Sequence, residues 1–216
     1  MSTQPVLVIG ASRGIGAELV RQYLRDGREV HATVRDLACP GELAGLSGAK
    51  LHRLDVRDVA HTEALATGLA GADLGVVIHN AGVNRTSRTE MMEINAEAPI
   101  RVIESLLDAE AIAPGGVVAI MTSQMGSRGD RGGSLGTYGE SKAVLNDEFR
   151  RREAAWAARG VIAVVVHPGW VRTDMGGSSA PLSVEESVEG VRRLIGGLTR
   201  DQHGRFWTWD AHEHPW

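Results

Sequence analysis

The sequence predicts an α/β fold, a single doubly wound domain built on a parallel sheet of about seven strands. Short runs of β-branched and other apolar residues, such as PVLVIG and VIAVVVHPG, alternate with longer amphipathic segments along the whole chain. Strands that are apolar throughout are typical of a parallel sheet with helices on both faces. No linker, repeat or low-complexity segment divides the chain, so we expect one domain over residues 1–216.

Each predicted strand is a short apolar run bounded by Gly, Pro or polar residues. The strands are expected at 5–10, 28–34, 49–56, 73–82, 115–123 and 161–169, with a last edge strand around Trp207 and Trp209. The intervening helices show apolar residues at helical spacing and are expected at 14–27, 57–71, 88–111, 137–160 and 184–198. The helix 88–111 should end before Pro114, because proline interrupts helical hydrogen bonding.

Composition excludes several classes of protein. Hydrophobic residues make up 43% and charged residues 23% of the 216 residues, which is typical of a globular domain and not of a disordered chain. A net charge of -4 gives no reason to expect nucleic acid or an anionic membrane as a partner. The apolar runs are too short to cross a bilayer, the N-terminal residues lack the features of a signal peptide, and the single Cys39 cannot form an internal disulfide. We therefore expect a cytoplasmic protein.

Three glycines follow the first predicted strand and open the first predicted helix. In GASRGIG these are Gly10, Gly14 and Gly16. Glycines here permit a tight turn and a close approach of the backbone to a pyrophosphate, which the N-terminus of the helix favours. Their position after the first strand predicts a Rossmann-type dinucleotide site, and the alternative is a merely structural turn.

A tyrosine and a lysine lie four residues apart at the start of a later helix. In YGESKAVLN, this spacing places Tyr138 and Lys142 on one helix face. A free tyrosine has a pKa of about 10, and a neighbouring ammonium lowers it. We expect the pKa of Tyr138 to be lowered by Lys142, so that the phenol can exchange a proton with an alcohol or carbonyl oxygen. The alternative is an exposed pair on an ordinary helix face.

A serine at the end of the fifth strand should reach the same edge of the sheet. The hydroxyl of Ser123 could there donate a hydrogen bond to a reacting oxygen and stabilise the charge that develops on it. Ser127 is nearer to Tyr138 in sequence and competes for this role.

The motifs GASRGIG, HNAG, Asn95, Ser123, YGESK and HPGWVRTD occur in the order typical of one enzyme family. Over nearly its whole length the chain resembles the short-chain dehydrogenase/reductases. The segments HPGWVRTDMGG and FWTWDAHEHPW are most similar to the small C-factor and sniffer-type carbonyl reductase subgroup. Ile9 and His79 depart from the family's usual threonine and asparagine.

The resemblance implies a catalytic set of Asn95, Ser123, Tyr138 and Lys142. In this scheme Ser123 binds the reacting oxygen and Tyr138 acts as acid or base. Lys142 anchors ribose hydroxyls and relays a proton through a water held by Asn95. The alternative for Asn95 is a solvent-facing residue in mid-helix.

The resemblance also implies which residues bind the dinucleotide. They are Gly10, Ser12, Arg13, Gly14, Ile15, Gly16, Arg35, Asp55, Val56, Asn80, Ala81, Gly82, Tyr138, Lys142, Pro168, Gly169, Val171 and Thr173. Asp55 would contact the adenine and Thr173 the nicotinamide carboxamide, while the alternative for Asp55 is a cap on the following helix. No metal site is expected, since HEH near the C-terminus has no further acidic or thiol ligands beside it.

The expected cofactor is NADPH rather than NADH. Counting eighteen residues on from Gly16 reaches Val34, where NAD-preferring relatives carry an acid. The next residue is Arg35, and Arg13 lies in the glycine loop, so two guanidiniums could bind a 2′-phosphate. Asp36 keeps NADH open as the alternative.

The predicted function is NADPH-dependent reduction of a carbonyl (aldehyde, ketone or quinone) to an alcohol by hydride transfer. The partner is then a small-molecule carbonyl or alcohol substrate, and the working direction stays open. The alternative is a cofactor-binding signalling protein of the C-factor type in which turnover is secondary. The subunit number is also open, with homodimer and homotetramer as the candidates.

Overall fold

In the computed structural model, which describes residues 3–129 and 136–216, seven strands form one parallel sheet in the order β3-β2-β1-β4-β5-β6-β7. The strands are β1 (Val6–Ile9), β2 (Val30–Val34), β3 (Ala49–Arg53), β4 (Leu74–His79), β5 (Ile112–Met121), β6 (Ile162–His167) and β7 (Phe206–Thr208). The strand order reverses between β1 and β4. On one side of this point the sheet runs from β1 to β3, and on the other side it runs from β4 to β7. The predicted doubly wound α/β fold is confirmed.

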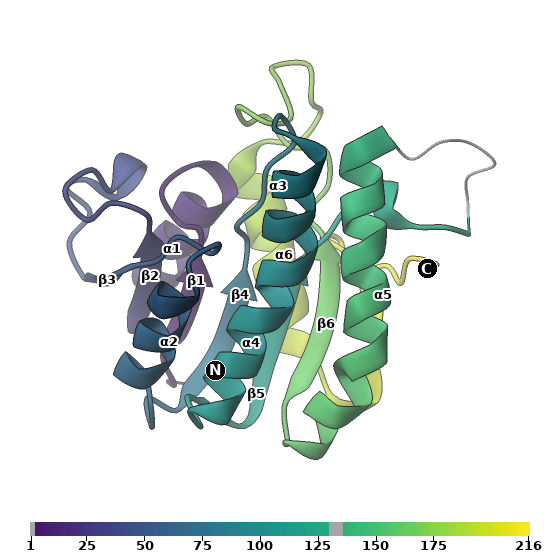
Figure 1. Cartoon of the computed structure of the whole chain (residues 1–216). Coiled ribbons are helices and arrows are strands. Elements are labelled where there is room, and N and C mark those ends of the chain that lie inside the picture. Colours follow the sequence, from purple (N-terminus) through teal and green to yellow (C-terminus); the bar gives the residue numbers. More distant parts are fainter. Residues whose placement is uncertain (1–2, 130–135) are drawn as a thin grey trace.

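Helices cover both faces of this sheet (Figure 1). On one face lie α2 (Val59–Gly68), α4 (Ala98–Asp108) and α5 (Gly136–Ala158), and on the other lie α1 (Gly14–Arg25) and α6 (Val184–Gly197). Each face buries its own apolar cluster against the strands. The binding crevice of such a sheet lies at the carboxyl ends of the strands, where the order reverses.

Strand β1 shows why the apolar runs form the centre of the sheet. All four of its residues are buried. Val6 and Val8 pack into the cluster under α1 and α6, whereas Leu7 and Ile9 pack into the cluster under α4 and α5. Burying one such side chain contributes about 1.5–3 kcal/mol, so a run that is apolar on both sides is stable only between two helical layers.

The predicted helix 88–111 is in fact composed of three segments. α3 (Arg88–Met92) is followed by a π-helical turn, η2 (Glu93–Glu97), and then by α4. The predicted strand 115–123 begins earlier than expected, at Ile112, so that Pro114 lies inside β5. A register shift where β5 pairs with Leu74 and Val76 of β4 accommodates the proline, which cannot donate to a regular ladder.

Short 3-10 helices occupy several connections. They are η1 (Gly41–Leu43), η3 (Gln124–Gly126) and η4 (Arg200–Gln202). The sequence SRGDRGGSLG, residues 127–136, also predicts a bulge in the chain, and this segment lies mostly at residues 130–135, outside the described residues. Within the described ranges, no helix is both long and apolar enough to span a membrane.

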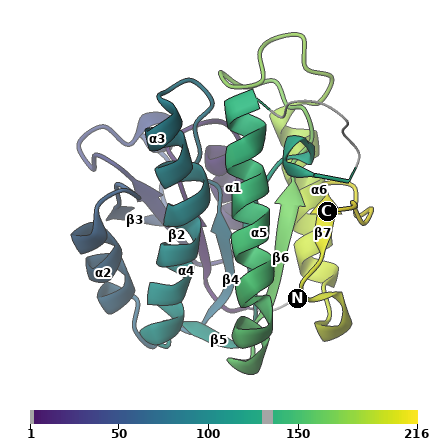
Figure 2. The ribbon, with the colours of Figure 1, turned by 45° about the vertical axis from the view of Figure 1, so that its right-hand side comes forward.

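The C-terminal tail returns along the edge strand β7 (Figure 2). Trp207 and Glu213 form an antiparallel bridge, and the N–H of His214 donates to the carbonyl of Phe206 at 2.7 Å. The ring of Trp216 then stacks on Phe149, with centroids 6.1 Å apart. The tail therefore covers the edge strand and joins the core.

Candidate active site

The glycine loop between β1 and α1 is packed so closely that its first and last glycines cannot be replaced. Gly10 has φ of +81°, and a Cβ there would lie 2.7 Å from the backbone of Ala81. A Cβ on Gly16 would lie 2.2 Å from the carbonyl oxygen of Gly10, which accepts a hydrogen bond from Asn80 Nδ2 at 2.9 Å. Such a tight turn against a helix N-terminus is a cradle that fits a dinucleotide pyrophosphate.

A cavity of about 750 Å³ opens over this loop. Most of the predicted cofactor residues line it, namely Gly10, Ser12, Arg13, Gly14, Ile15, Arg35, Asp55, Val56, Asn80, Ala81, Gly82, Tyr138, Lys142, Pro168 and Thr173. Five predicted residues are not on its wall, namely Gly16, Asn95, Ser123, Gly169 and Val171. These five lie behind or beside it, in contact with residues that do line it.

Two hydroxyls meet at the chemical end of the cavity. Tyr138 lies half-buried in the first turn of α5 and shares a hydrogen bond with Ser123. Ser123 is buried at the start of η3, where its Oγ accepts from the N–H of Met125 at 3.1 Å. Ser127 is also buried, but its Oγ has no hydrogen-bond partner in the described structure, so Ser123 is the serine beside the phenol.

The expected acidification of Tyr138 by Lys142 is wrong, because the pKa of Tyr138 is raised and not lowered. Burial raises the pKa of Tyr138 to about 12, and only the Ser123 hydrogen bond opposes this shift. Lys142 is itself buried, its Nζ donates to the carbonyl of Met121 at 2.9 Å, and burial lowers its pKa to about 8. Desolvation is the dominant cause for both groups, and the phenol keeps its proton at neutral pH.

Asn95 does not face solvent but is fully buried in the π-helical turn. Its Oδ1 accepts from the N–H of Val83 at 2.8 Å, while Nδ2 donates to the Val83 carbonyl at 2.7 Å and to Ser141 Oγ at 3.0 Å. The amide thereby ties the loop after β4 to helix α5, one residue from Lys142. Single π-helical turns within helices are frequent at functional sites.

The two predicted phosphate-binding arginines line the same cavity but differ in their partners. Arg13 Nη1 pairs with Asp174 Oδ2 at 3.0 Å, whereas Arg35 makes no ion pair with any described residue. Arg35 is thus the free cation of the pair.

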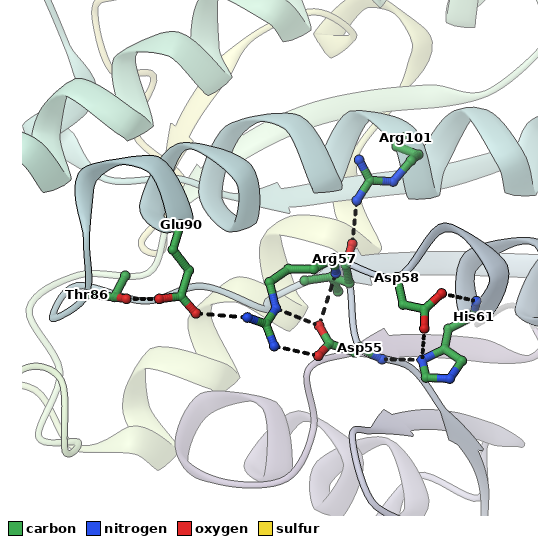
Figure 3. A network of polar contacts seen from close by, with 8 residues as sticks. Asp55, Arg57, Asp58, His61, Thr86, Glu90 and Arg101 are labelled. Carbon is green, nitrogen blue, oxygen red and sulfur yellow. Dashed lines mark hydrogen bonds and ion pairs between the residues drawn. The ribbon is translucent and has the colours of Figure 1, made fainter.

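A third arginine, missed by sequence reasoning, lines the cavity beside Asp55. Arg57 Nη2 pairs with Asp55 Oδ2 at 2.8 Å and Arg57 Nη1 with Glu90 Oε1 at 3.1 Å (Figure 3). This contact holds the pKa of Asp55 below its usual value. The helix cap is Asp58, not Asp55, because Asp58 accepts from the N–H of His61. The spacing of two residues between Asp55 and Arg57 could have revealed the pair.

Glu42, also missed, brings a carboxylate to the glycine loop. Its Oε1 accepts from the N–H of Gly14 at 2.8 Å, and its Oε2 pairs with Arg21 Nη2 at 2.9 Å. These contacts hold the pKa of Glu42 below its usual value. No motif marks this residue, which comes from the connection between β2 and β3.

The turn after β6 delivers Thr173 to the cavity. Gly169 has φ of +89°, and a Cβ there would lie 2.3 Å from Leu182 Cδ1, so only glycine fits. Val171 forms a bridge with Leu182, and Thr173 Oγ1 accepts from the N–H of Gly176 at 3.1 Å. Nearby, Met175 lines the cavity, whereas the exposed Trp170 lines a neighbouring hollow.

In residues 3–129 and 136–216 there is no cluster of three or more His, Cys, Asp or Glu able to bind a metal ion. The side chains of HEH have other partners. His212 pairs with Asp210 at 3.0 Å, Glu213 pairs with Arg205 at 2.7 Å, and His214 packs on Phe206.

Comparison with known proteins agrees with this geometry. The family model for short chain dehydrogenases matches residues 4–181. The chain belongs to the short-chain dehydrogenase family. This dehydrogenase is 35% identical over 164 residues to the C-signal of Myxococcus xanthus, a match covering 71% of the chain and 99% of that protein.

Two solved structures show the same fold over the entire length of both chains. The short-chain dehydrogenase described here is 29% identical, with a TM-score of 0.88, to an NADPH-bound carbonyl reductase from chicken fatty liver. It is 26% identical, also with a TM-score of 0.88, to the carbonyl reductase Sniffer of D. melanogaster. The family resemblance expected from the motifs, including its sniffer-type character, is confirmed.

Proposed function

We propose that this short-chain dehydrogenase is an NADPH-dependent carbonyl reductase that converts an aldehyde, ketone or quinone to an alcohol. The observation that carries the proposal is the hydrogen-bonded pair of Tyr138 and Ser123, beside the cavity that the glycine loop closes at its other end. A protein that only binds a nucleotide has no need of a proton donor there.

NADPH fits the charge of the cavity. Arg13 and Arg35 both line it, and guanidinium groups match the oxygens of a 2′-phosphate. The carbonyl reductase from chicken fatty liver, a similar structure, binds NADPH. Once bound, the nicotinamide would supply the hydride, and the protein supplies orientation and electrostatics.

The side chains divide the remaining work of carbonyl reduction. Ser123 Oγ donates to the carbonyl oxygen and stabilises the negative charge that develops on it. Tyr138 donates its proton to that oxygen, and the high pKa keeps the phenol protonated before the reaction. Lys142 contributes a buried cation to the cavity wall, and Asn95 fixes the loop and helix around it.

The proposal is tested with Tyr138→Phe, which removes only the reacting hydroxyl. Because a positioned general acid contributes about 10²–10⁴-fold, we expect the rate of NADPH oxidation with aldehydes, ketones and quinones to fall by about that factor. Binding of NADPH, measured by calorimetry, should stay within about threefold of the native value. The other tyrosine, Tyr23, lies in α1 and provides a matched control. The Tyr23→Phe protein should retain the native rate. Full activity in the Tyr138→Phe protein would refute the mechanism.

The similarity to C-signal favours one second candidate, a signalling protein that uses the bound nucleotide without turnover. The panel of carbonyl compounds separates the two functions. Tight NADPH binding with no oxidation of NADPH by any class of carbonyl would favour the signalling candidate over the reductase.

A further inference from the structure

We infer that Glu42 determines cofactor specificity, by competing as an internal anion with the 2′-phosphate of NADP(H) for Arg21. The inference rests on the proposed binding of NADP(H) and concerns the same cavity, whose wall includes Glu42 and Arg21. Neither residue belongs to the motifs that the sequence shares with its family.

The connection that carries Glu42 is docked directly on the glycine loop. The N–H of Glu42 donates to the carbonyl of Ser12 at 2.8 Å, and the N–H of Gly14 donates back to Glu42 Oε1 at 2.8 Å. Gly41 permits this approach, because it has φ of +67° and a Cβ there would lie 2.2 Å from the Ser12 carbonyl oxygen. Glu42 is therefore held on both sides of Arg13, through its own N–H at Ser12 and through its carboxylate at Gly14.

The carboxylate occupies donors that an anion would otherwise use. The first N–H groups of a helix have no partner within the helix and attract negative charge. Glu42 uses the N–H of Gly14, the first residue of α1, and its Oε2 pairs with Arg21 at 2.9 Å. A phosphate that approaches the same donors meets the negative charge of Glu42 beside the Gly14 amide and beside Arg21, which also contacts Glu18 at 3.4 Å.

Two other arginines of the cavity are occupied in the same way, since Arg13 is paired with Asp174 and Arg57 with Asp55 and Glu90. Arg172 donates to the carbonyls of Ala180 and Pro181, whereas Arg35 makes no ion pair with any described residue. In the present arrangement a 2′-phosphate would find one free guanidinium, and each further contact would require a carboxylate to move. Loss of the Glu42 charge would release Arg21 from its closer carboxylate partner, and Arg21 would keep the 3.4 Å contact of its Nη1 with Glu18 Oε2.

The experiment compares binding of NADP⁺ and NAD⁺, which differ only in the 2′-phosphate, by isothermal titration calorimetry. Glu42→Gln removes the charge, while its amide oxygen can still accept the hydrogen bond of Gly14. We expect the Kd of NADP⁺ to fall about tenfold, since one anion near a phosphate costs about that much at the effective dielectric of a protein surface. The Kd of NAD⁺ should change less than about threefold.

Three further variants make the result specific. Glu189→Gln removes an exposed carboxylate of α6 whose one ion pair among the described residues is with Arg193, and should change neither Kd. Arg35→Ala should weaken the binding of NADP⁺ but not the binding of NAD⁺. The double variant Glu42→Gln/Arg21→Gln should lose most of the gain in NADP⁺ affinity, because we attribute this gain to Arg21 released from Glu42. Melting curves establish that each variant is folded.

An unchanged or weakened Kd of NADP⁺ in the Glu42→Gln protein would overturn the inference, as would an equal gain for both nucleotides. These readouts do not depend on turnover. Failure of the native protein to reduce any carbonyl would therefore count against the proposed function, whereas a changed NADP⁺/NAD⁺ ratio would still support the role of Glu42.

Discussion

Lys142 is a buried cation that the chain retains at a cost in stability. Only 4% of the side chain is exposed, and burial lowers its pKa from 10.5 to about 8. Below pH 8 the ammonium is charged in both the folded and the unfolded chain, so the folded state carries a desolvation penalty of roughly 3 kcal/mol. Between pH 8 and 10.5 Lys142 binds more protons in the unfolded chain than in the folded chain. Its contribution to the free energy of unfolding therefore rises with pH.

Replacement of the cation should consequently stabilise the fold while it abolishes function. We expect Lys142→Met to raise the free energy of unfolding at pH 7 by about 1–3 kcal/mol, and this gain should shrink as the pH approaches 10. Urea unfolding at the two pH values measures both effects. The other lysine serves as the control, because Lys50 is exposed and Lys50→Met should bring no gain. A destabilised Lys142→Met protein at pH 7 would contradict the account of the buried charge.

At the scale of elements, the π-helical turn η2 connects two parts of the site. Without this irregularity, Asn95 would occupy a regular helix, where an asparagine has little preference for burial. Through Asn95 the turn holds Val83 in the loop after β4 and Ser141 in α5. The Asn95 side chain thus takes the place of a backbone partner for the N–H and the carbonyl of Val83.

Loss of this amide should destabilise the fold and misplace Lys142. Asn95→Ala leaves the half-buried N–H and carbonyl of Val83 and the buried Ser141 hydroxyl without their Asn95 partner, so we expect the free energy of unfolding to fall by about 2–4 kcal/mol. Urea unfolding measures the change. The neighbouring Asn84 makes a single exposed hydrogen bond to the carbonyl of Met175, and Asn84→Ala should cost less than about 1 kcal/mol. Equal losses in the two variants would show that Asn95 has no special structural role.

At the scale of the whole molecule, the last residues of the chain help to close the core. The ring of Trp216 lies 6.1 Å from Phe149 and 5.7 Å from Phe206, and the Arg150 guanidinium lies 5.1 Å from its centroid. The Trp216 carbonyl accepts from the N–H of Gly129 at 2.8 Å. The C-terminus therefore joins β7 to α5 and to the segment that follows η3.

Truncation of this side chain should lower stability although it is remote from the chemistry. We expect Trp216→Ala to reduce the free energy of unfolding by about 2–4 kcal/mol, through lost aromatic packing and the lost cation–π contact. A thermal melt followed by circular dichroism measures the effect. Trp170→Ala removes an exposed indole, 53% of which is accessible, and should shift the melting temperature far less. A Trp216→Ala protein as stable as the native one would show that the tail only rests on the surface.

Much of the fold follows from local patterns in the sequence. The strands β1, β4 and β6 are continuous apolar runs, and such runs form a parallel sheet because only two helical layers can bury both of their faces. The ends of η2 and the start of β5 were harder to predict, since a π-helical turn and a register shift depend on the neighbours of the segment and not on its own residues.

By itself the sequence determined the sheet, the glycine loop and the placement of Tyr138 and Lys142 on one helix, because each of these depends on residues close together in the chain. Only the tertiary structure decided that burial raises the pKa of Tyr138 to about 12, and that Glu42 reaches the N–H of Gly14 across 28 residues of chain. Desolvation and ion pairing depend on the distance between groups in space, which the order of residues leaves open until the chain is folded.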